Sequence, residues 1–525
     1  MKHYKEYFFN ILPCIVYGIL CGTVTGAMIF LYKFAAGKLS HFSEEIYTHA
    51  AESPILIVAV FAVLIAFAFM LAGIQKKVPE AKGGGIPRCE GILRGVLSFS
   101  RVKTMIATVL GSFISFFCGL PVGSEGPAVL IGTSLGGICS GPKGKRSAWG
   151  RYVMSGGAAA GFAVATGSPL AAMLFALEEI HKRFTPMLVL TVSTSVISAT
   201  YINELLCSLF GLSPALVALS EIPDFELKDV LYLIILGVIV ACAVGIFDAS
   251  LGYFGKFTKK LKNKVPDVVK LIIVFVLSGI MGLFFRDGAF SGHEIIENIH
   301  SYGESLSLLF AVFIVRLIMM VLVADSGATG GIFIPTLTIG ALVGAIGGRF
   351  LIFAGMPAEL LPSVVMLGMC AFMGGTLRAP LTATIFFIEL TCKYTNFFYV
   401  ALVIVVVNSI TNIFNQTPFY DRVLENLVEK QNEGKTARIT SFKMKVSEKA
   451  FVIGKTVRDI MWPPSCVVIS ITRDDNTAQD MDNDGEKKLF EGDTVIIRAK
   501  IYDEKKITAS FRELVGSQYP IEEVT

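Results

Sequence analysis

Long apolar runs, rather than alternating or amphipathic patterns, dominate residues 1–430 of this chain. Residues 54–74 and 229–254 each supply the roughly 20 apolar positions that a helix needs to cross the hydrocarbon core of a bilayer. Many other apolar segments are shorter, or are interrupted by glycine and proline. The pattern predicts an all-α polytopic membrane domain in which several helices are broken.

The first apolar run follows Lys2 and Lys5 and continues to Tyr32 without a small-residue cleavage site. It is therefore predicted to be a membrane segment and not a signal peptide. These two lysines and the basic stretch Lys143, Lys145 and Arg146 favour the cytoplasmic side by the positive-inside rule. We expect a multi-pass protein of the cell (plasma) membrane with both termini in the cytoplasm.

The pattern changes after the membrane region. From residue 438, β-branched residues alternate with charges, 466–471 forms an apolar strand, and a turn at 491–493 precedes another strand. Residues 476–486 are predicted to be an exposed loop. We expect a 1–430 membrane domain followed by a 431–525 segment that holds a linker and a small cytoplasmic α/β domain.

Composition supports this division and excludes several classes of protein. The chain of 525 residues is 53% hydrophobic and only 17% charged, which is too apolar for a soluble protein, and its net charge of +4 is too small to indicate a nucleic-acid partner. Its ten cysteines occur singly, and no histidine cluster has metal-ligand spacing. No paired aspartates or His-Glu-x-x-His mark a membrane hydrolase. We expect neither an enzyme nor a metal or cofactor site.

The apolar region also contains an internal duplication. Gly123 to Pro127 runs into AVLIGTSLGG, and Gly331 to Pro335 runs into TLTIGALVGA, with glycine and proline at matching offsets. A second pair of similar stretches follows, in which Pro169 aligns with Pro380 and Glu178 aligns with Glu389. The polar residues 219–228 separate the two halves of the duplication, at about 8–215 and 226–415. Helices broken at corresponding places in two repeats indicate a transporter's binding site. Their free N–H groups favour an anion over a cation.

Four motifs, in the same order along the chain as in a known family, give the membrane region its resemblance to that family. They are Gly83 to Pro87, Gly123 to Pro127, Gly331 to Pro335, and the late Tyr420. Residues 1–430 resemble the CLC family of chloride channels and proton-coupled chloride transporters. The resemblance implies an inverted-repeat fold with tilted and broken helices, a homodimer in the lipid bilayer with one anion path per subunit, and chloride and protons as the transported ions.

Glu125 is the central candidate residue, because a charge inside an apolar segment is costly and indicates function. It could be a helix N-cap carboxylate, or a gate that competes with the anion and swings away when protonated. The resemblance implies the gate, and matches Glu179 to the internal proton-transfer glutamate. Glu178 is interpreted as a helix-end charge. Keeping both Glu125 and Glu179 favours an antiporter over a passive voltage- or ligand-gated chloride channel.

The resemblance also implies an anion site in which Ile332 and Phe333 offer backbone N–H groups and Tyr420 donates its hydroxyl. Phe333 could equally be a core residue, and Tyr420 an interfacial belt residue. The full set of expected anion-binding residues is Gly84, Gly85, Ile86, Ser124, Gly126, Ile332, Phe333 and Tyr420.

Gly84 departs from the family, which usually has a serine donor there. A hydrogen bond to a charged group contributes about 1.5–3 kcal/mol. The departure leaves open an exchanger for another anion such as nitrate or fluoride, although the retained Tyr420 favours chloride over fluoride. Glu90 could lie on the proton route or be only an interhelical salt-bridge partner.

The C-terminal segment does not look like the paired CBS module that CLC proteins often carry. It resembles the TrkA-C or RCK-C domain through the stretches VGKTVRD, VVISI and EGDTVIIR. Several such domains dimerise and bind small ligands, cyclic di-AMP in some, and Arg473 beside strand 466–471 is the candidate ligand residue. A dimerisation or stability module without a ligand is the alternative.

Overall fold

The structure is a computed structural model that describes most of the chain. The described residues are 2–141, 147–214, 216, 222–261, 265–297, 305–414, 416–432, 436–448, 450–463, 466–473, 478–480 and 485–524. Lys143, Lys145 and Arg146, which contribute to the predicted orientation, lie outside them.

Helices account for the membrane domain. Those before the polar break are α1 (Lys2–Ala50), α2 (Pro54–Lys77), η1 (Pro79–Ala81), α3 (Ile86–Leu93), α4 (Arg101–Phe117), α5 (Glu125–Cys139), α6 (Ser147–Thr166), α7 (Pro169–Phe175), the π-helical η2 (Ala176–His181) and α8 (Pro186–Phe210). Those after it are η3 (Leu227–Asp229), α9 (Val230–Leu261), α10 (Asp267–Phe284), η4 (Arg286–Gly288), α11 (His293–Glu297), α12 (Leu306–Ser326), α13 (Phe333–Phe353), η5 (Ala358–Leu360), α14 (Leu361–Leu377), α15 (Pro380–Thr391), η6 (Tyr394–Asn396), α16 (Phe397–Ile413) and α17 (Phe419–Gln431).

Nine helices within the described residues are long and apolar enough to cross a membrane. Their burial separates two roles. In α2 only 17% of the most apolar stretch is buried inside the protein, whereas the corresponding figure for α14 is 89%. Helices such as α2 therefore lie on the outside of the domain, while α13 and α14 form its interior.

Short helices interrupt the long ones, as the glycine and proline pattern predicts. Helix α3 has eight residues and α7 has seven, and both carry a proline in the first turn. Proline is tolerated there because the first N–H groups of a helix have no partner within it. The fold class, a mostly helical membrane protein with broken helices and a small C-terminal sheet domain, is confirmed.

The two repeats meet through reciprocal carboxylate contacts. Glu178, near the end of the first repeat's α7–η2 unit, accepts hydrogen bonds from the backbone N–H groups of Leu381 and Thr382 at the start of α15 (3.0 and 2.7 Å). Glu389, near the end of α15, accepts bonds from Leu170 and Ala171 at the start of α7 (2.7 and 2.8 Å). Each unit thus ends where the other begins, as antiparallel repeats require.

The C-terminal module (residues 436–524) forms one antiparallel sheet. Its elements are β1 (Arg438–Lys445), β2 (Cys466–Thr472), β3 (Ala478–Asp480), β4 (Thr494–Ile501), α18 (Glu504–Val515) and β5 (Ile521–Val524), with strand order β3-β2-β4-β1-β5. Phe442, Ile497 and Phe511 are buried between the sheet and α18. The prediction that 476–486 is all loop was wrong at β3, which pairs with β2.

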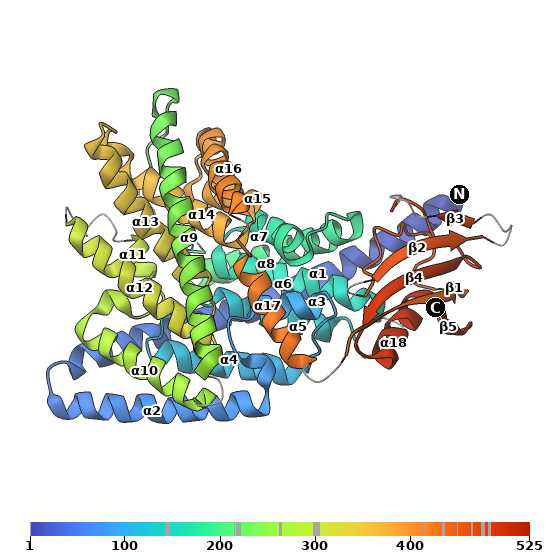
Figure 1. Cartoon of the computed structure of the whole chain (residues 1–525), viewed down its shortest axis with the longest axis horizontal. Helices are drawn as coiled ribbons and strands as arrows, with labels where there is room; N and C mark the ends of the chain where they lie inside the picture. Colours follow the sequence, from blue (N-terminus) through green and yellow to red (C-terminus); the bar gives the residue numbers. More distant parts are fainter. Residues whose placement is uncertain are drawn as a thin grey trace.

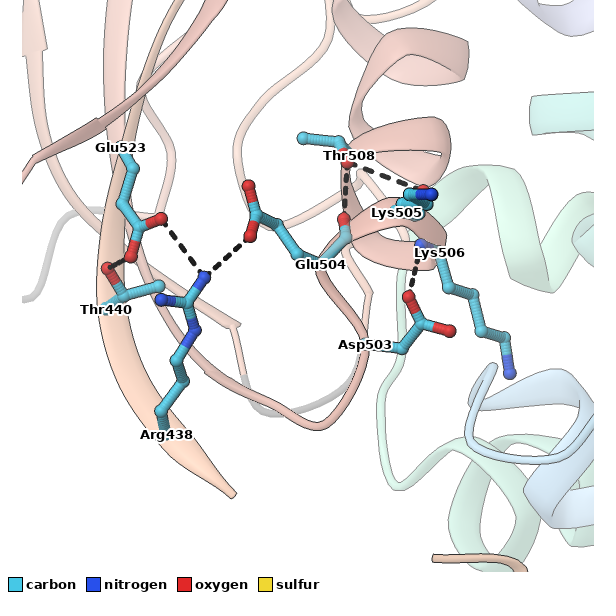
Figure 2. A network of polar contacts seen from close by, with 8 residues as sticks. All are labelled: Arg438, Thr440, Asp503, Glu504, Lys505, Lys506, Thr508 and Glu523. Carbon is cyan, nitrogen blue, oxygen red and sulfur yellow. Dashed lines mark hydrogen bonds and ion pairs between the residues drawn. The ribbon is translucent and has the colours of Figure 1, made fainter. Parts of the chain in front are cut away.

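Polar contacts tie α18 and the last strand to β1 (Figure 2). Arg438 forms ion pairs with Glu504 at the start of α18 (2.7 Å) and with Glu523 of β5 (3.1 Å). Asp503 caps α18 by accepting a hydrogen bond from the N–H of Lys506 (3.3 Å). The module is thereby closed around its own core.

The C-terminal module lies at one end of the molecule, and both chain termini lie at that same end (Figure 1). It contacts the start of α6. Arg151 donates hydrogen bonds to the carbonyl oxygens of Met461 and Trp462, and Tyr152 donates one to that of Asp459. The rings of Trp149 and Phe451 meet edge to face at 5.4 Å. The sequence pattern did not reveal this docking surface.

Candidate functional site

Three glycine-rich segments meet in the interior of the membrane domain. Gly123 and Gly331 exchange a pair of backbone hydrogen bonds, each 2.7 Å long. Gly83 donates a backbone bond to the carbonyl of Gly327 (3.1 Å). A Cβ placed on Gly126 would lie 1.8 Å from the carbonyl oxygen of Gly84, so no larger residue fits there. The two duplicated segments, far apart in sequence, are therefore in direct contact.

This contact brings together the N-terminal ends of α3, α5 and α13. Helix α5 begins at Glu125, and α13 begins at Phe333 after Ile332. The first N–H groups of each helix have no acceptor within the helix and carry the positive end of its dipole. The expected anion-binding positions that lie at these helix starts are Gly84, Gly85, Ile86, Ser124, Gly126, Ile332 and Phe333. Such a cluster of N–H groups suits an anion.

Glu125 stands at this meeting point as the first residue of α5. Its side chain is buried, and one carboxylate oxygen accepts a hydrogen bond from the Ser124 hydroxyl at 3.1 Å. The other oxygen, Oε2, has no hydrogen-bond partner among the described residues. It occupies space that the missing side chain of Gly123 leaves open, because a Cβ there would lie 2.2 Å from Oε2. The backbone N–H groups of Glu125 itself and of Ile334, at the start of α13, also act on this carboxylate, so it lies between the starts of α5 and α13.

Tyr420 and Phe333 can be judged against their alternative interpretations. Tyr420, at the start of α17, is buried, so it does not belong to a lipid-facing belt, and its hydroxyl has no hydrogen-bond partner among the described residues. The Phe333 ring packs edge to face against Phe162 (5.0 Å) and Phe386 (5.6 Å). Its side chain is a core residue while its backbone lies at the start of α13, so the core packing of the ring does not exclude an anion-binding role for the backbone.

Glu179 lies in η2, also buried, and its Oε1 has no hydrogen-bond partner among the described residues. Charged side chains surround it: Glu90 forms an ion pair with Arg94, which also reaches Asp421 (3.7 Å), and Lys182 pairs with Asp421 (2.6 Å). Glu90 thus pairs directly with Arg94 of its own segment, and through Arg94 it is connected to Asp421 of α17.

Two cavities approach the site from opposite ends. The inner cavity, about 840 Å³, lies on the side of the C-terminal module and is lined by Arg94, Arg151, His181, Lys182 and Asp421 among others. The outer cavity, about 390 Å³, is lined by Ser124 together with residues of α1, η4 and α11. Glu125 therefore lies next to the outer cavity, and Glu179 lies next to the inner one.

Arg473 does not join these residues. Its guanidinium lies over the ring of Phe490 (5.0 Å), donates to the carbonyl of Lys488 (3.5 Å) and faces Asp493 (3.6 Å), all within the C-terminal module. Sequence reasoning missed two contributors to the surroundings of the site, Lys33 in the outer cavity and Arg151 in the inner one. Lys33 could have been noticed as a single charge inside the apolar stretch FLYKFAAG.

Comparisons with known proteins show which family this chain resembles. A family model described as voltage gated chloride channel matches residues 66–412. The H(+)/Cl(−) exchange transporter ClcA of Salmonella paratyphi B is 25% identical over 441 residues, which cover 81% of this chain and 91% of that protein. ClcA of Salmonella schwarzengrund is 26% identical over 431 residues, covering 79% and 89%.

Solved structures show the same fold. The crystal structure of a slow cyanobacterial Cl⁻/H⁺ antiporter superimposes with a TM-score of 0.73 at 25% identity, covering 80% of this chain and 99% of that one. A CLC-type fluoride/proton antiporter superimposes with a TM-score of 0.64 at 18% identity, covering 78% and 97%, and shows likeness of fold alone.

Proposed function

The chain belongs to the family of voltage-gated chloride channels, the CLC family, and from that membership we propose that it is a proton-coupled chloride antiporter of the cell membrane. The observation that carries the proposal is the contact between Gly123 and Gly331, which places the N-terminal ends of α5 and α13 together beside a buried carboxylate. Relatives over most of its length are named H(+)/Cl(−) exchange transporters.

The proposed anion site uses the helix starts and one hydroxyl. Chloride binds the backbone N–H groups of Ile332 and Phe333 and the Tyr420 hydroxyl, whose lack of a partner supports a ligand role. Inside an apolar interior these dipoles act at low dielectric, where they attract an anion more strongly than in water.

The proposed coupling uses the two carboxylates. Ionised Glu125 competes with the anion for the positive end of the helices, and protonation removes that competition and releases the side chain. Glu179 passes the proton between the inner cavity and the interior. The burial of both groups, each with one unpartnered oxygen, supports roles in which they change protonation state.

Two alternatives share the fold. A passive chloride channel would need no proton at Glu179, yet the chain keeps a buried carboxylate there. An exchanger for nitrate or fluoride remains a candidate because Gly84 offers no hydroxyl.

We also propose that the C-terminal module regulates transport from the cytoplasm. Ser155 lies one helical turn after Arg151 and Tyr152, the two residues of α6 that bind the module. Its hydroxyl is hydrogen-bonded to His181 (2.7 Å) in η2, the short helix that also carries Glu179. A change at the docking surface can thus reach the proton-transfer segment through α6. That both termini lie in the cytoplasm is a proposal that rests on the basic residues of the chain and the positive-inside rule. A homodimer, and cyclic di-AMP or another small ligand near Arg473, are proposals that rest on the family resemblances.

The test is the reversal potential of purified protein in liposomes, with a proton gradient imposed at fixed chloride gradient. A coupled antiporter shifts its reversal potential with the pH difference. A reversal potential that depends on chloride alone would remove the antiporter in favour of the channel.

A further inference from the structure

The outer cavity has one wall made by a single face of α1. Lys33, Ala36, Gly37, Ser40 and Glu44 line it, at the spacing that places residues on one side of a helix. Lys33 lies 19 residues beyond Cys14, which is near Lys455 of the C-terminal module. At about 1.5 Å per residue this separates Lys33 from the module side by about 28 Å. The cavity therefore opens on the side away from the module.

Other cations of this cavity are held by fixed partners. Arg286 pairs with Glu44 at 3.4 Å, and Arg316 donates to the carbonyl oxygens of Asp287, Ala289 and Phe290 at 2.6, 2.7 and 2.8 Å. Lys33 differs from them. Across the part of the chain that the structure describes, its ammonium has neither a hydrogen-bond acceptor nor a carboxylate within bonding distance.

Among charged groups, Glu125 has the strongest electrostatic interaction with Lys33. Their electrostatic interaction crosses from α1 to the start of α5. Ser124, which donates to the Glu125 carboxylate at 3.1 Å, lines the same cavity as Lys33. An ammonium, a hydroxyl and a carboxylate are thus arranged from the cavity toward the anion site.

We propose that Lys33 is a positioning residue for transport, which holds the incoming anion in the outer cavity beside the Ser124 hydroxyl and favours the ionised form of Glu125. The inference rests on the proposed gate role of Glu125. A partly buried ammonium without a partner is costly, and an anion is the group that satisfies it. Once Glu125 is protonated and moves away, the Ser124 hydroxyl is free to donate to the same anion.

The charge of Lys33 should also change the pH dependence of transport, because a nearby cation favours a carboxylate over the carboxylic acid. Other groups act on Glu125 as well. The residues that face Glu125 are Lys33 and Tyr32 of α1, Ser124, and Tyr420 of α17. The outer cavity has further titratable or charged residues, which are His41, Glu44, Arg286, Asp287, His293, Glu294 and Arg316. A variant that changes Lys33 alone keeps all of these.

The experiment compares Lys33→Gln, Lys33→Arg and Lys38→Gln in the full chain, reconstituted in liposomes. Lys38 is the matched control, since it is an exposed lysine on the same helix and does not line the cavity. Transport is measured against chloride on the outer-cavity side and against pH on that side.

For Lys33→Gln we expect the half-saturating chloride concentration to rise on the order of tenfold. We expect the pH profile of transport to move by roughly one unit to higher pH, because without the nearby cation the protonated form of Glu125 persists to a higher pH. Lys33→Arg should restore both quantities, and Lys38→Gln should leave them unchanged. A purely structural lysine would change neither quantity selectively.

Unchanged chloride dependence in Lys33→Gln, matching Lys38→Gln, would overturn the role of Lys33 whatever the coupling. If the wild-type protein carries chloride without protons, the proposed antiport fails, yet the chloride dependence still decides whether Lys33 holds the anion. Lys33→Met, which keeps the apolar stem, replaces Lys33→Gln if the latter does not purify as a folded protein.

Discussion

Glu125 and Glu179 show how two buried carboxylates can take different tasks. Glu125 begins a helix and lies next to the outer cavity, with a hydroxyl as its hydrogen-bond partner. Glu179 lies in a π-helical turn among the charges that border the inner cavity. In the proposed mechanism, Glu125 competes with an anion, and Glu179 exchanges protons on the side of the C-terminal module.

Replacing these carboxylates separately should separate the two transported ions. Glu179→Gln should abolish proton movement while chloride flux continues, because glutamine cannot carry a proton between the cavity and the interior. Glu125→Gln imitates the protonated gate and should uncouple or lock transport. Simultaneous recording of chloride and proton flux distinguishes these outcomes, and coupled exchange retained in both variants would refute the residue assignments.

Gly84→Ser should tighten chloride binding. A Cβ at this position meets only the carbonyl oxygen of Gly330, at 3.5 Å, which is an ordinary contact, so serine fits without displacement. Its hydroxyl would add one donor to a charged acceptor, worth about 1.5–3 kcal/mol. Calorimetric titration with chloride checks this, and an unchanged affinity would mean that Gly84 does not line the site.

Single residues differ in how far the sequence could reveal them. Glu125 was visible because a charge in an apolar, glycine-bounded segment is rare. Glu178 was interpreted as an ordinary helix-end charge, but it accepts backbone bonds from α15, a partner 203 residues away. Lys33 and the cavity it lines depend on how α1 packs against α5 and η4, which no local pattern contains.

At the scale of elements, the reciprocal contacts of α7 and α15 make a testable pair. Glu178 accepts two backbone bonds and one from the Thr382 hydroxyl (2.7 Å) at the start of α15. Removing its charge with Glu178→Gln should destabilise the protein by about 0.5–2 kcal/mol, the range for a helix cap. Glu389→Gln should cost a similar amount, since it caps α7 in the same way.

Thermal unfolding in detergent measures both effects. Glu359→Gln, an exposed carboxylate in η5, is the control and should unfold as the wild type does. If Glu178→Gln unfolded at the control temperature, the carboxylate would not be stabilising α15.

Elements were predicted where local chemistry decides them. The glycine and proline interruptions predicted the short helices, and the turn before β4 was evident from its glycine. Strand β3 was missed because its polar residues gain their structure from pairing with β2, a nonlocal contact.

At the scale of the whole molecule, the docking surface joins two parts that sequence analysis could only treat separately. Both tryptophans of the chain, Trp149 and Trp462, lie there. Arg151→Ala removes the hydrogen bonds to Met461 and Trp462, so we expect tryptophan emission to shift to longer wavelength as water enters. Arg183→Ala, an exposed cation of the same cavity, is the control, and equal spectra in both variants would contradict the docking role of Arg151.

Docking should also depend on pH through Lys455. Burial lowers the pKa of this lysine from its ordinary 10.5 to about 8. The docked state therefore binds fewer protons than a state in which Lys455 is exposed. The free-energy cost of docking that results from burying Lys455 is at its full value below pH 8, and it disappears as the pH rises toward 10.5. The midpoint of undocking, followed by tryptophan emission, should rise between pH 7 and pH 9.5, and Lys455→Met should abolish that rise; an equal rise in the variant would assign it to other groups.

The proposed anion site, where the N-terminal ends of α3, α5 and α13 meet, can be tested directly by anomalous diffraction from crystals grown in bromide. We predict an anomalous peak at the starts of α5 and α13, within hydrogen-bond distance of the N–H groups of Ile332 and Phe333 and of the Tyr420 hydroxyl. A bromide bound elsewhere in the membrane domain, with none at these helix starts, would contradict the site.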